Sequence, residues 1–337
     1  MDTIVKFNQL GGPEVLYLEQ VTEAEPKSGE VRIRVEAFGL NRAEALFRSG
    51  QYLEQPVFPS KIGLEAAGVV ESVGPGVTQV RVGDRVAVTP GQSIAQYGTH
   101  GDAAIVPASV LVKYPENISP IEAAASFMQY LTAYFAFVEL ANVQPGQTIL
   151  ITAASSSTGV AAIELAHLLG ARAIATTRTQ AKRQAILNAG ADEVIVTAEE
   201  NLPERVKEMT GGKGADLIYD PIAGGTLPLL AESVAWGGQI ILYGFLDDAP
   251  TEFPLFSAFF RNFLLRTYMI YNFTGHAGLG LARNETAYRT GVAFVVKALA
   301  EGALKPVIAA TFPLKEIVQA NQYLESNQQL GKIVVTV

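Results

Sequence analysis

The segment 147–190 constrains the fold more than any other part of the chain. It begins with an apolar, β-branched run, Thr148–Thr152, which is long enough for one buried parallel strand. Small residues follow at 153–159, and then come a helical pattern over Val160–Leu169 and a second strand-like run over Arg172–Thr177. A strand, a turn of small residues, a helix and a strand within about 30 residues form the βαβ unit of a dinucleotide site.

The turn at 153–159 departs from the usual dinucleotide motif. Small residues are needed there because the pyrophosphate approaches the backbone and is bound by free N–H groups at the helix N-terminus. Of the glycines in the G-x-G-x-x-G pattern, only Gly159 is clearly in place. The turn alone therefore leaves two interpretations open, a nucleotide site or an ordinary turn in another α/β protein.

The pattern that follows Gly190 favours the nucleotide site. Strand-like runs continue to alternate with helical ones as far as residue 271. The further strands are expected at 193–197, 215–219, 238–245 and 264–271, and the helices between them at 202–210 and 226–234. Roughly six strands alternating with helices over about 130 residues predict a doubly wound parallel sheet, which binds its ligands at the carboxyl ends of the strands.

Residues 1–120 have a different character, rich in strands and turns. Val31–Phe38 alternates apolar and charged residues, as a half-buried strand does. The first clear helix start is Ser119-Pro120, a Ser cap followed by Pro at the first helical position. Because 337 residues are about twice a typical domain, we expect two domains with a change of character near residue 120.

Composition excludes several classes of function. A net charge of −8 argues against nucleic acid or an anionic membrane as a partner. The absence of Cys excludes disulfides, thiolate metal sites and a Cys nucleophile. The N-terminus lacks the pattern of a secretory signal, and apolar stretches end well before the ~20 residues of a membrane span. We therefore expect a cytoplasmic protein.

Short motifs in a fixed order cover nearly the whole chain. They are Gly11-Gly12-Pro13-Glu14-Val15-Leu16, Gly39-Leu40-Asn41-Arg42, Arg48-x-Gly50-x-Tyr52, Gly63-x-Glu65-x-Ala67-Gly68-Val69-Val70, Val82-Gly83-Asp84-Arg85-Val86, Leu131-Thr132-Ala133, Pro145-Gly146, Gly190-Ala191-Asp192-Glu193 and Gly331-Lys332. In this order they resemble the medium-chain dehydrogenase/reductase superfamily, most closely its zinc-free quinone oxidoreductase branch. The resemblance implies an α/β protein with a GroES-like β-rich domain of residues 1–120 and 270–337. It also implies an inserted Rossmann domain of residues 121–269 that binds NADP(H).

The resemblance implies an enzyme without a metal. Zinc-dependent members carry a Cys at the position of Asn41 and a His after Gly63, where this chain has Leu64. Because Cys is absent and His occurs only at 100, 167 and 276, sequence neighbours cannot assemble a zinc site.

The end of the second strand favours NADPH over NADH. NAD sites place an Asp or Glu there for the ribose 2′-hydroxyl, whereas this strand ends Ala175–Thr179 without an acid. Arg178 and Lys182 can instead neutralise a 2′-phosphate, with Thr177 or Thr179 as a hydrogen-bond partner. The alternative is a solvated helix start formed by Arg178, Lys182 and Arg183, although cations at a helix N-terminus oppose its dipole.

The predicted cofactor site combines the small turn, the end of the second strand and positions that match the family. Its residues are Thr132, Ala154, Ser155, Ser156, Ser157, Thr158, Gly159, Thr177, Arg178, Lys182, Tyr243, Gly244 and Lys332. The quinone-reductase pattern has glycines where Ser156 and Ser157 stand. Tyr243 has the alternative role of a core residue.

Tyr52 and Asn41 are the candidate catalytic residues. In similar enoyl-thioester reductases the Tyr that matches Tyr52 donates a proton to the reduced double bond, and the alternative for Tyr52 is to stack over the nicotinamide. The alternative for Asn41 is to cap the helix that follows it.

The resemblance predicts NADPH-dependent reduction of quinones or α,β-unsaturated carbonyl compounds by hydride transfer. One alternative is a 2-enoyl-thioester reductase, and another is a protein that binds NADPH without significant catalysis, as lens proteins similar to this family do. The Phe-rich stretch 253–273 is either core between the domains or part of a homodimer interface formed by edge-strand pairing, as in similar proteins.

Overall fold

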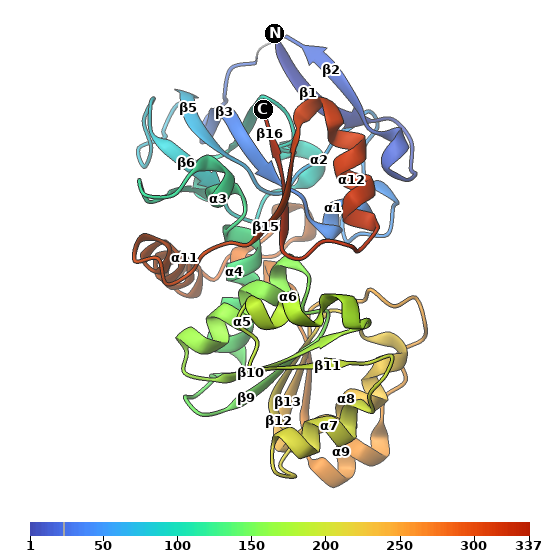
Figure 1. Cartoon of the computed structure of the whole chain (residues 1–337). Coiled ribbons are helices and arrows are strands. Elements are labelled where there is room, and N and C mark those ends of the chain that lie inside the picture. The colour runs from blue at the N-terminus through green and yellow to red at the C-terminus, as the bar shows by residue number, and fades with distance from the viewer. Residues whose placement is uncertain (23) are drawn as a thin grey trace. The chain divides into compact units, whose positions relative to one another are not determined.

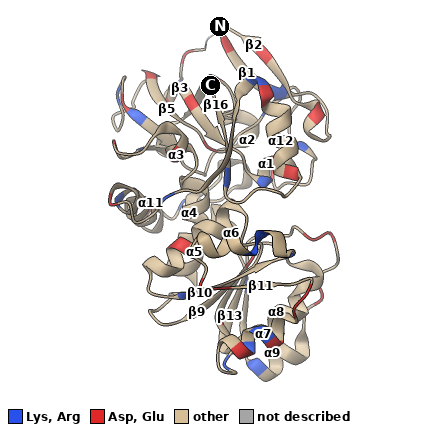
Figure 2. Cartoon of the chain, viewed as in Figure 1, with Lys and Arg blue, Asp and Glu red and all other residues tan. Residues whose placement is uncertain are grey.

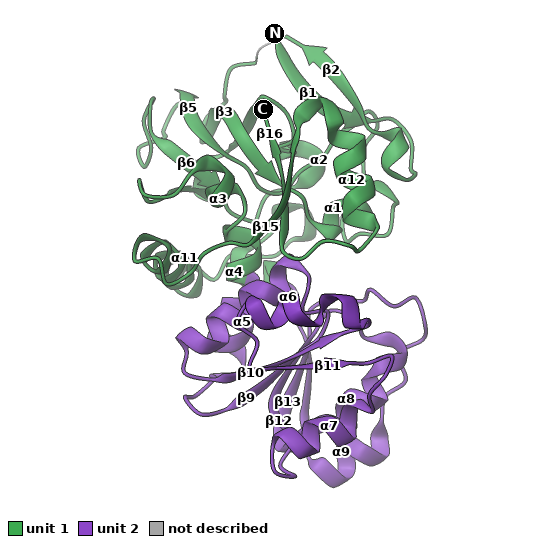
Figure 3. Ribbon diagram, in the orientation of Figure 1, with its two compact units in different colours: residues 1–131, 270–337 green, residues 132–269 purple. Residues whose placement is uncertain are grey.

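The computed structural model describes residues 1–22 and 24–337 and divides into two compact units, which Figure 3 shows in two colours. Unit 1 comprises residues 1–131 and 270–337, and unit 2 comprises residues 132–269. Helix α4 (Phe127–Tyr134) crosses the first boundary and continues as a π-helical segment, Phe135–Leu140. Unit 2 is therefore inserted into the sequence of unit 1.

Unit 2 contains a six-stranded, wholly parallel sheet in the order β11-β10-β9-β12-β13-β14, with helices on both of its faces (Figure 1). The strands are β9 (Thr148–Ile151), β10 (Arg172–Thr177), β11 (Glu193–Val196), β12 (Ala215–Asp220), β13 (Val234–Leu242) and β14 (Leu264–Thr267). The helices are α5 (Ser157–Leu168), α6 (Arg183–Asn188), α7 (Leu202–Met209), α8 (Leu227–Ser233) and α9 (Leu255–Arg261). This strand order is that of the Rossmann fold, so the predicted doubly wound sheet is confirmed.

Two local differences from the expected pattern have clear causes. Helix α5 begins at Ser157, three residues before the helical run expected from the apolar periodicity. The reason is that Ser156 caps the helix, so the polar residues after it form the first turn. Strand β14 ends at Thr267 instead of Tyr271, because Tyr271 begins the short helix α10 (Tyr271–Thr274).

Unit 1 is built on a seven-stranded sheet, which contains the path β15-β16-β3-β5-β6-β8 and β7 paired with β3, and on a three-stranded sheet, β2-β1-β4. Its strands are β1 (Asp2–Phe7), β2 (Tyr17–Val21), β3 (Glu30–Gly39), β4 (Ser60–Lys61), β5 (Ala67–Val73), β6 (Arg85–Val88), β7 (Ala103–Pro107), β8 (Leu111–Lys113), β15 (Ile308–Pro313) and β16 (Lys332–Thr336). Its other helices are α1 (Arg42–Arg48), α2 (Ile94–Tyr97), α3 (Pro120–Ala124), α11 (Glu285–Ala300) and α12 (Ile317–Glu325). The predicted GroES-like, β-rich class of this part is confirmed.

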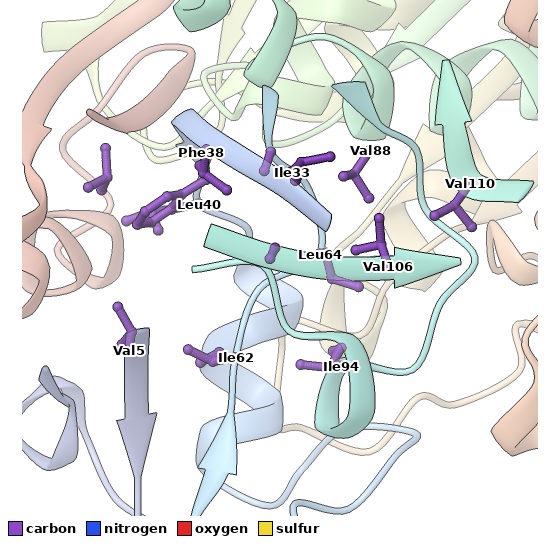
Figure 4. Close-up of a cluster of buried hydrophobic side chains, with 14 of the residues drawn as sticks. Val5, Ile33, Phe38, Leu40, Ile62, Leu64, Val88, Ile94, Val106 and Val110 are labelled. Atoms are coloured by element: carbon purple, nitrogen blue, oxygen red, sulfur yellow. The ribbon is translucent and has the colours of Figure 1, made fainter. Parts of the chain in front are cut away.

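The core of unit 1 lies against strand β3. The alternation expected over Val31–Phe38 is present, since Val31, Ile33 and Val35 are buried and Arg34 is exposed. Figure 4 shows side chains of this core: Val5, Ile33, Phe38, Leu40, Ile62, Leu64, Val88, Ile94, Val106 and Val110. Two segments that are far apart in the sequence meet here, because β16 pairs antiparallel with β3.

Acidic and basic residues are interspersed over both units (Figure 2). Within the described ranges, 1–22 and 24–337, no helix combines the length and the apolar character that a membrane span requires.

Candidate functional site

The order of the strands in the parallel sheet of unit 2 reverses between β9 and β12. These two strands are neighbours in the sheet although they are not consecutive in the sequence. In open α/β sheets this switch point is where ligands bind, at the carboxyl ends of the strands. Here the Thr152 hydroxyl donates to Oδ1 of the buried Asp220, and the N–H groups of Ile222 and Ala223 donate to Oδ2 at 3.0 and 2.6 Å. Burial raises the pKa of Asp220, although these hydrogen bonds oppose the shift.

The small turn after β9 presents the N-terminus of α5 at this same edge. Ser156 Oγ accepts the N–H of Gly159 at 3.0 Å and so caps the helix. The N–H groups of Ser157 and Thr158, in the first turn, have no partner within the helix and are donors for an anion. Ser156 therefore fills the structural role of a cap, which accounts for one Ser in place of a glycine.

Gly159 serves close packing. A Cβ atom at Gly159 would lie 2.6 Å from Ala154 Cα and 2.8 Å from Ala153 O. The helix can therefore approach the end of β9 only with glycine at this position, which is the role of the third glycine in the dinucleotide motif. Ala154, in the turn, is fully buried against this contact.

Two cations lie beside the turn, at the carboxyl end of β10. Lys182 Nζ donates to Ser155 Oγ at 3.0 Å. Partial burial lowers the pKa of Lys182, and the positive charge of Arg178 lowers it further. Strand β10 ends at Thr177, whose hydroxyl donates to the Thr179 carbonyl at 3.4 Å, and Arg178 is exposed. This corner is positive, whereas an NAD site places a carboxylate there.

The carboxyl end of β13 adds Tyr243 and Gly244. The Tyr243 ring stacks on Tyr219 with centroids 3.9 Å apart and planes at 15°. Burial and the nearby Asp220 carboxylate raise the pKa of Tyr243, and the Ser156 hydroxyl opposes that shift. A Cβ atom at Gly244 would lie 2.7 Å from Pro221 O, so β13 passes close to the segment after β12.

In unit 1, Asn41 and Lys332 form a buried polar network with Glu65. Asn41 Oδ1 accepts from Lys332 Nζ at 2.6 Å, and Asn41 Nδ2 donates to Glu65 Oε1 at 3.0 Å. Lys332 also forms an ion pair with Glu65, and both residues are 1% exposed. Asn41 is in addition the N-cap residue of α1, and its backbone N–H donates to Glu44 Oε2 at 2.8 Å. The capping role weighed for Asn41 is thus present together with the contact to Lys332.

Glu44 extends this network toward His100. Glu44 Oε1 accepts the N–H of Leu64 at 2.9 Å and lies 3.5 Å from His100 Nε2. Burial opposes ionisation of Glu44, but His100 and the Asn41 N–H outweigh it and hold the pKa of Glu44 below its ordinary value. Across residues 1–22 and 24–337, no three His, Cys, Asp or Glu side chains are placed to share a metal ion.

Tyr52 lies in the loop after α1. Its hydroxyl donates to that of Tyr271 at 3.1 Å, and burial raises the pKa of Tyr52 to about 12. At neutral pH the Tyr52 side chain therefore holds its proton.

The structure brings the predicted residues together in sets within each unit. In unit 2, Lys182 contacts Ser155, and Ser156 interacts with Gly159 and Tyr243. Thr132 lies apart from these sets, within α4. In unit 1, Asn41 contacts Lys332, and Tyr52 lies apart from this pair. Asp220 and Tyr271 are not among the residues that the sequence motifs predict. An acid that ends a central strand is a signal for Asp220, whereas Tyr271 carries no local signal.

Comparison with known proteins agrees with this fold. Residues 27–116 match the alcohol dehydrogenase GroES-like domain family, and residues 157–281 match the family described as zinc-binding dehydrogenase. The chain is 32% identical to quinone oxidoreductase 1 of Escherichia coli over 98% of both chains. It is 30% identical to the 2-haloacrylate reductase of Burkholderia sp over 98% of this chain and 97% of that protein.

A solved structure extends the comparison to three dimensions. The Escherichia coli quinone oxidoreductase complexed with NADPH superimposes with a TM-score of 0.89 at 30% identity, over 99% of this chain and 100% of that chain. The fold is that of an oxidoreductase of the dehydrogenase/reductase type. The chain belongs to the medium-chain dehydrogenase/reductase superfamily, in its quinone-oxidoreductase-like branch.

Proposed function

We propose that this protein uses NADPH to reduce quinones or α,β-unsaturated carbonyl compounds by hydride transfer, without a metal ion. The observation that carries the proposal is the positive corner at the carboxyl end of β10. There Lys182 contacts Ser155 beside the N-terminus of α5, Arg178 adds a second charge, and no acid ends the strand. A 2′-phosphate neutralises the charges of these cations, whereas a free ribose hydroxyl does not.

The other parts of the cofactor fit the same edge of the sheet. The N–H groups of Ser157 and Thr158 would hold the pyrophosphate, and the close packing at Gly159 brings the N-terminus of α5 to the end of β9. Thr132, Thr177 and Tyr243 complete the proposed cofactor-binding set in unit 2. In unit 1 the proposed cofactor-binding residue is Lys332, which holds the amide oxygen of Asn41, a proposed catalytic residue. We also propose a cytoplasmic location, where NADPH is available to the enzyme.

The substrate class follows from the relatives. Those named above are a quinone oxidoreductase and a 2-haloacrylate reductase, and both names describe reduction of an electron-poor conjugated compound. NADPH, when bound, supplies the hydride. For an unsaturated carbonyl substrate Tyr52 is the proposed proton donor, because its raised pKa keeps the hydroxyl protonated at neutral pH.

The metal-free part of the proposal rests on Lys332. Zinc-dependent members place a Cys ligand where this chain has Asn41, and here the amide oxygen of Asn41 accepts a hydrogen bond from an ammonium group at 2.6 Å. A fixed cation at this distance repels a second cation, so the network built around Lys332 and Glu65 opposes zinc binding.

We further propose that residues 1–120 with 270–337, and 121–269, act as the catalytic and cofactor-binding domains of a homodimer. Strand β14 is an edge of the six-stranded sheet. The neighbouring helix α9 exposes Phe256 and Phe259 by 76% and 82%. Large exposed apolar side chains beside an open strand edge are typical of an interface.

Comparison of three substrate classes tests the proposed function. Purified protein is given NADPH or NADH with 1,4-benzoquinone, an enal or an enoyl thioester, and oxidation of the cofactor is followed. We expect turnover with benzoquinone and the enal, and a clear preference for NADPH. A preference for the enoyl thioester would favour the 2-enoyl-thioester reductase, and tight NADPH binding without turnover would favour the non-catalytic alternative.

A further inference from the structure

The half-buried Tyr52 is joined to a buried tyrosine from a distant part of the chain. Tyr271, the first residue of α10, lies 219 residues later, and the two hydroxyl oxygens are 3.1 Å apart. Both residues belong to unit 1. Tyr271 is 1% exposed, so the partner of its hydroxyl is fixed by the protein and not by bulk water.

We propose that Tyr271 is a positioning residue, whose hydroxyl donates a hydrogen bond to the oxygen of Tyr52 once Tyr52 has given its proton to an unsaturated carbonyl substrate. The inference rests on the proposed function and deepens it. In the structure Tyr52 donates to Tyr271, and rotation about the C–O bonds reverses the direction of this hydrogen bond.

Such a donor is needed because proton transfer from Tyr52 leaves a negative charge on the Tyr52 oxygen. Bound NADPH would supply a hydride to the β-carbon, where a C–H bond would form while the electron pair of the double bond moves onto the carbonyl as an enolate. The Tyr52 O–H bond then breaks, its proton goes to the α-carbon, and the electron pair remains on the Tyr52 oxygen as a tyrosinate. Water later returns a proton to Tyr52.

The surroundings of Tyr52 make that tyrosinate costly without help. Burial raises the pKa of Tyr52, and the carboxylates of Glu44 and Glu54 raise it further. The hydrogen bond from Tyr271 acts in the opposite direction, because a donor favours the ionised form of its acceptor. Tyr271 itself remains a neutral donor, since burial holds its pKa well above the ordinary value.

Tyr271 is held in place by a second set of contacts. Its ring lies edge-on to His276, with centroids 4.7 Å apart and planes at 61°. His276 is buried, and its Nε2 lies 3.4 Å from Glu54 Oε2. Glu54 is fixed in turn by the Ser93 hydroxyl and by the N–H of Ile94 at 2.9 Å. The Tyr271 side chain therefore has a defined position, and only its hydroxyl hydrogen is free to turn.

Quinones provide the internal control. Hydride transfer to a quinone gives a hydroquinone anion, which takes its proton from water, so neither Tyr52 nor Tyr271 is needed as a proton source. The contribution of Tyr271 should therefore depend on the substrate, whereas a purely structural contribution would not.

The test measures kcat and KM of Tyr52→Phe, Tyr271→Phe and the double variant with an enal and with 1,4-benzoquinone. We expect Tyr271→Phe to lower kcat for the enal about tenfold, the effect of one hydrogen bond to a charged group. We expect kcat for benzoquinone and KM for NADPH to change less than about twofold. The double variant should be no slower with the enal than Tyr52→Phe alone, because Tyr271 acts through Tyr52.

Tyr288→Phe is the matched control. Tyr288 is another buried tyrosine of unit 1, and its hydroxyl bonds Thr89 Oγ1 at 2.7 Å. We expect Tyr288→Phe to leave the ratio of enal to benzoquinone turnover unchanged. If Tyr271→Phe does not fold, a monofluorinated tyrosine at position 271 keeps the ring and strengthens the donor, and kcat for the enal should then be at least that of the wild type.

Different failures have different meanings. Unchanged enal turnover in Tyr271→Phe, together with a loss in Tyr52→Phe, overturns the inference and leaves the proposed function intact. Equal losses with the enal and benzoquinone in Tyr271→Phe also overturn it. Unchanged enal turnover in Tyr52→Phe removes the proton-donor role itself, and with it the role of Tyr271. A fall in kcat for the enal with the monofluorinated tyrosine at position 271 likewise overturns the inference.

Discussion

Among single residues, Arg178 is the one for which the proposed NADPH site makes the clearest prediction. Its charge acts together with Lys182 at the end of β10. Arg178→Glu replaces attraction of a 2′-phosphate by repulsion, so we expect KM for NADPH to rise by at least tenfold and KM for NADH to change little. Steady-state kinetics with both cofactors measure this change.

Arg183 offers a matched control for that variant. It begins α6, and its NH1 lies 3.4 Å from Glu200 Oε1. Arg183→Glu makes the same change of charge five residues away, and we expect the preference for NADPH to remain. An unchanged NADPH/NADH preference in Arg178→Glu would refute the assignment of Arg178.

A second prediction for a single residue concerns Lys332. Lys332→Met leaves the buried Glu65 carboxylate without its countercharge, and we expect the free energy of unfolding to fall by about 3–5 kcal/mol. Urea denaturation measures the fall. Lys332→Met combined with Glu65→Gln removes both charges and should recover part of the loss. A double variant no more stable than Lys332→Met would contradict the ion-pair explanation.

Elements of structure were more predictable than contacts between residues. The β-branched runs and small turns between 147 and 271 predict six strands, and all six are present. Strands β9 to β13 are mostly buried parallel strands whose composition specifies them, whereas the edge strand β14 is largely exposed. The first turn of α5 was missed because Ser155–Thr158 is as typical of a turn as of a capped helix start. The pair Tyr52 and Tyr271 depends on tertiary packing across 219 residues, and no local pattern encodes it.

The proposed homodimer leads to a prediction about helix α9, which lies next to strand β14. Phe256→Glu together with Phe259→Glu places two charges on the exposed aromatic face of α9. Because charges are depleted from the centre of interfaces, we expect a dimer of the wild type and a monomer of this variant in sedimentation velocity at micromolar concentration. Leu168→Glu, on an exposed position of α5, is the control and should remain dimeric. A monomeric wild type would remove the proposal.

The whole molecule should be sensitive to alkaline pH. Burial raises the pKa of Tyr52 to about 12 and that of Tyr219, Tyr268 and Tyr271 well above the ordinary 10.0. The folded state therefore keeps protons that the unfolded chain loses above about pH 10. The stability from these groups is fully present below about pH 10 and is lost as the pH rises toward the folded-state pKa values.

The expected size of this effect is about 1.4 kcal/mol per pH unit for each buried tyrosine. Urea midpoints between about pH 8 and 11, followed together with tyrosinate absorbance, measure it. We expect a steep fall beginning near pH 10, with unfolding and tyrosinate formation occurring together. Ionisation of these tyrosines in a chain that stays folded would contradict the burial argument.

The insertion of unit 2 also determines the order in which the chain can be completed during synthesis. Residues 132–269 emerge from the ribosome as an uninterrupted unit, with every strand of their sheet present. Unit 1 must wait, because β3 pairs with β16, which is made only after the whole of unit 2. Until β16 is made, residues 37–39 of β3 lack this partner strand, so the nascent protein depends on rapid pairing with residues 334–336 to avoid aggregation.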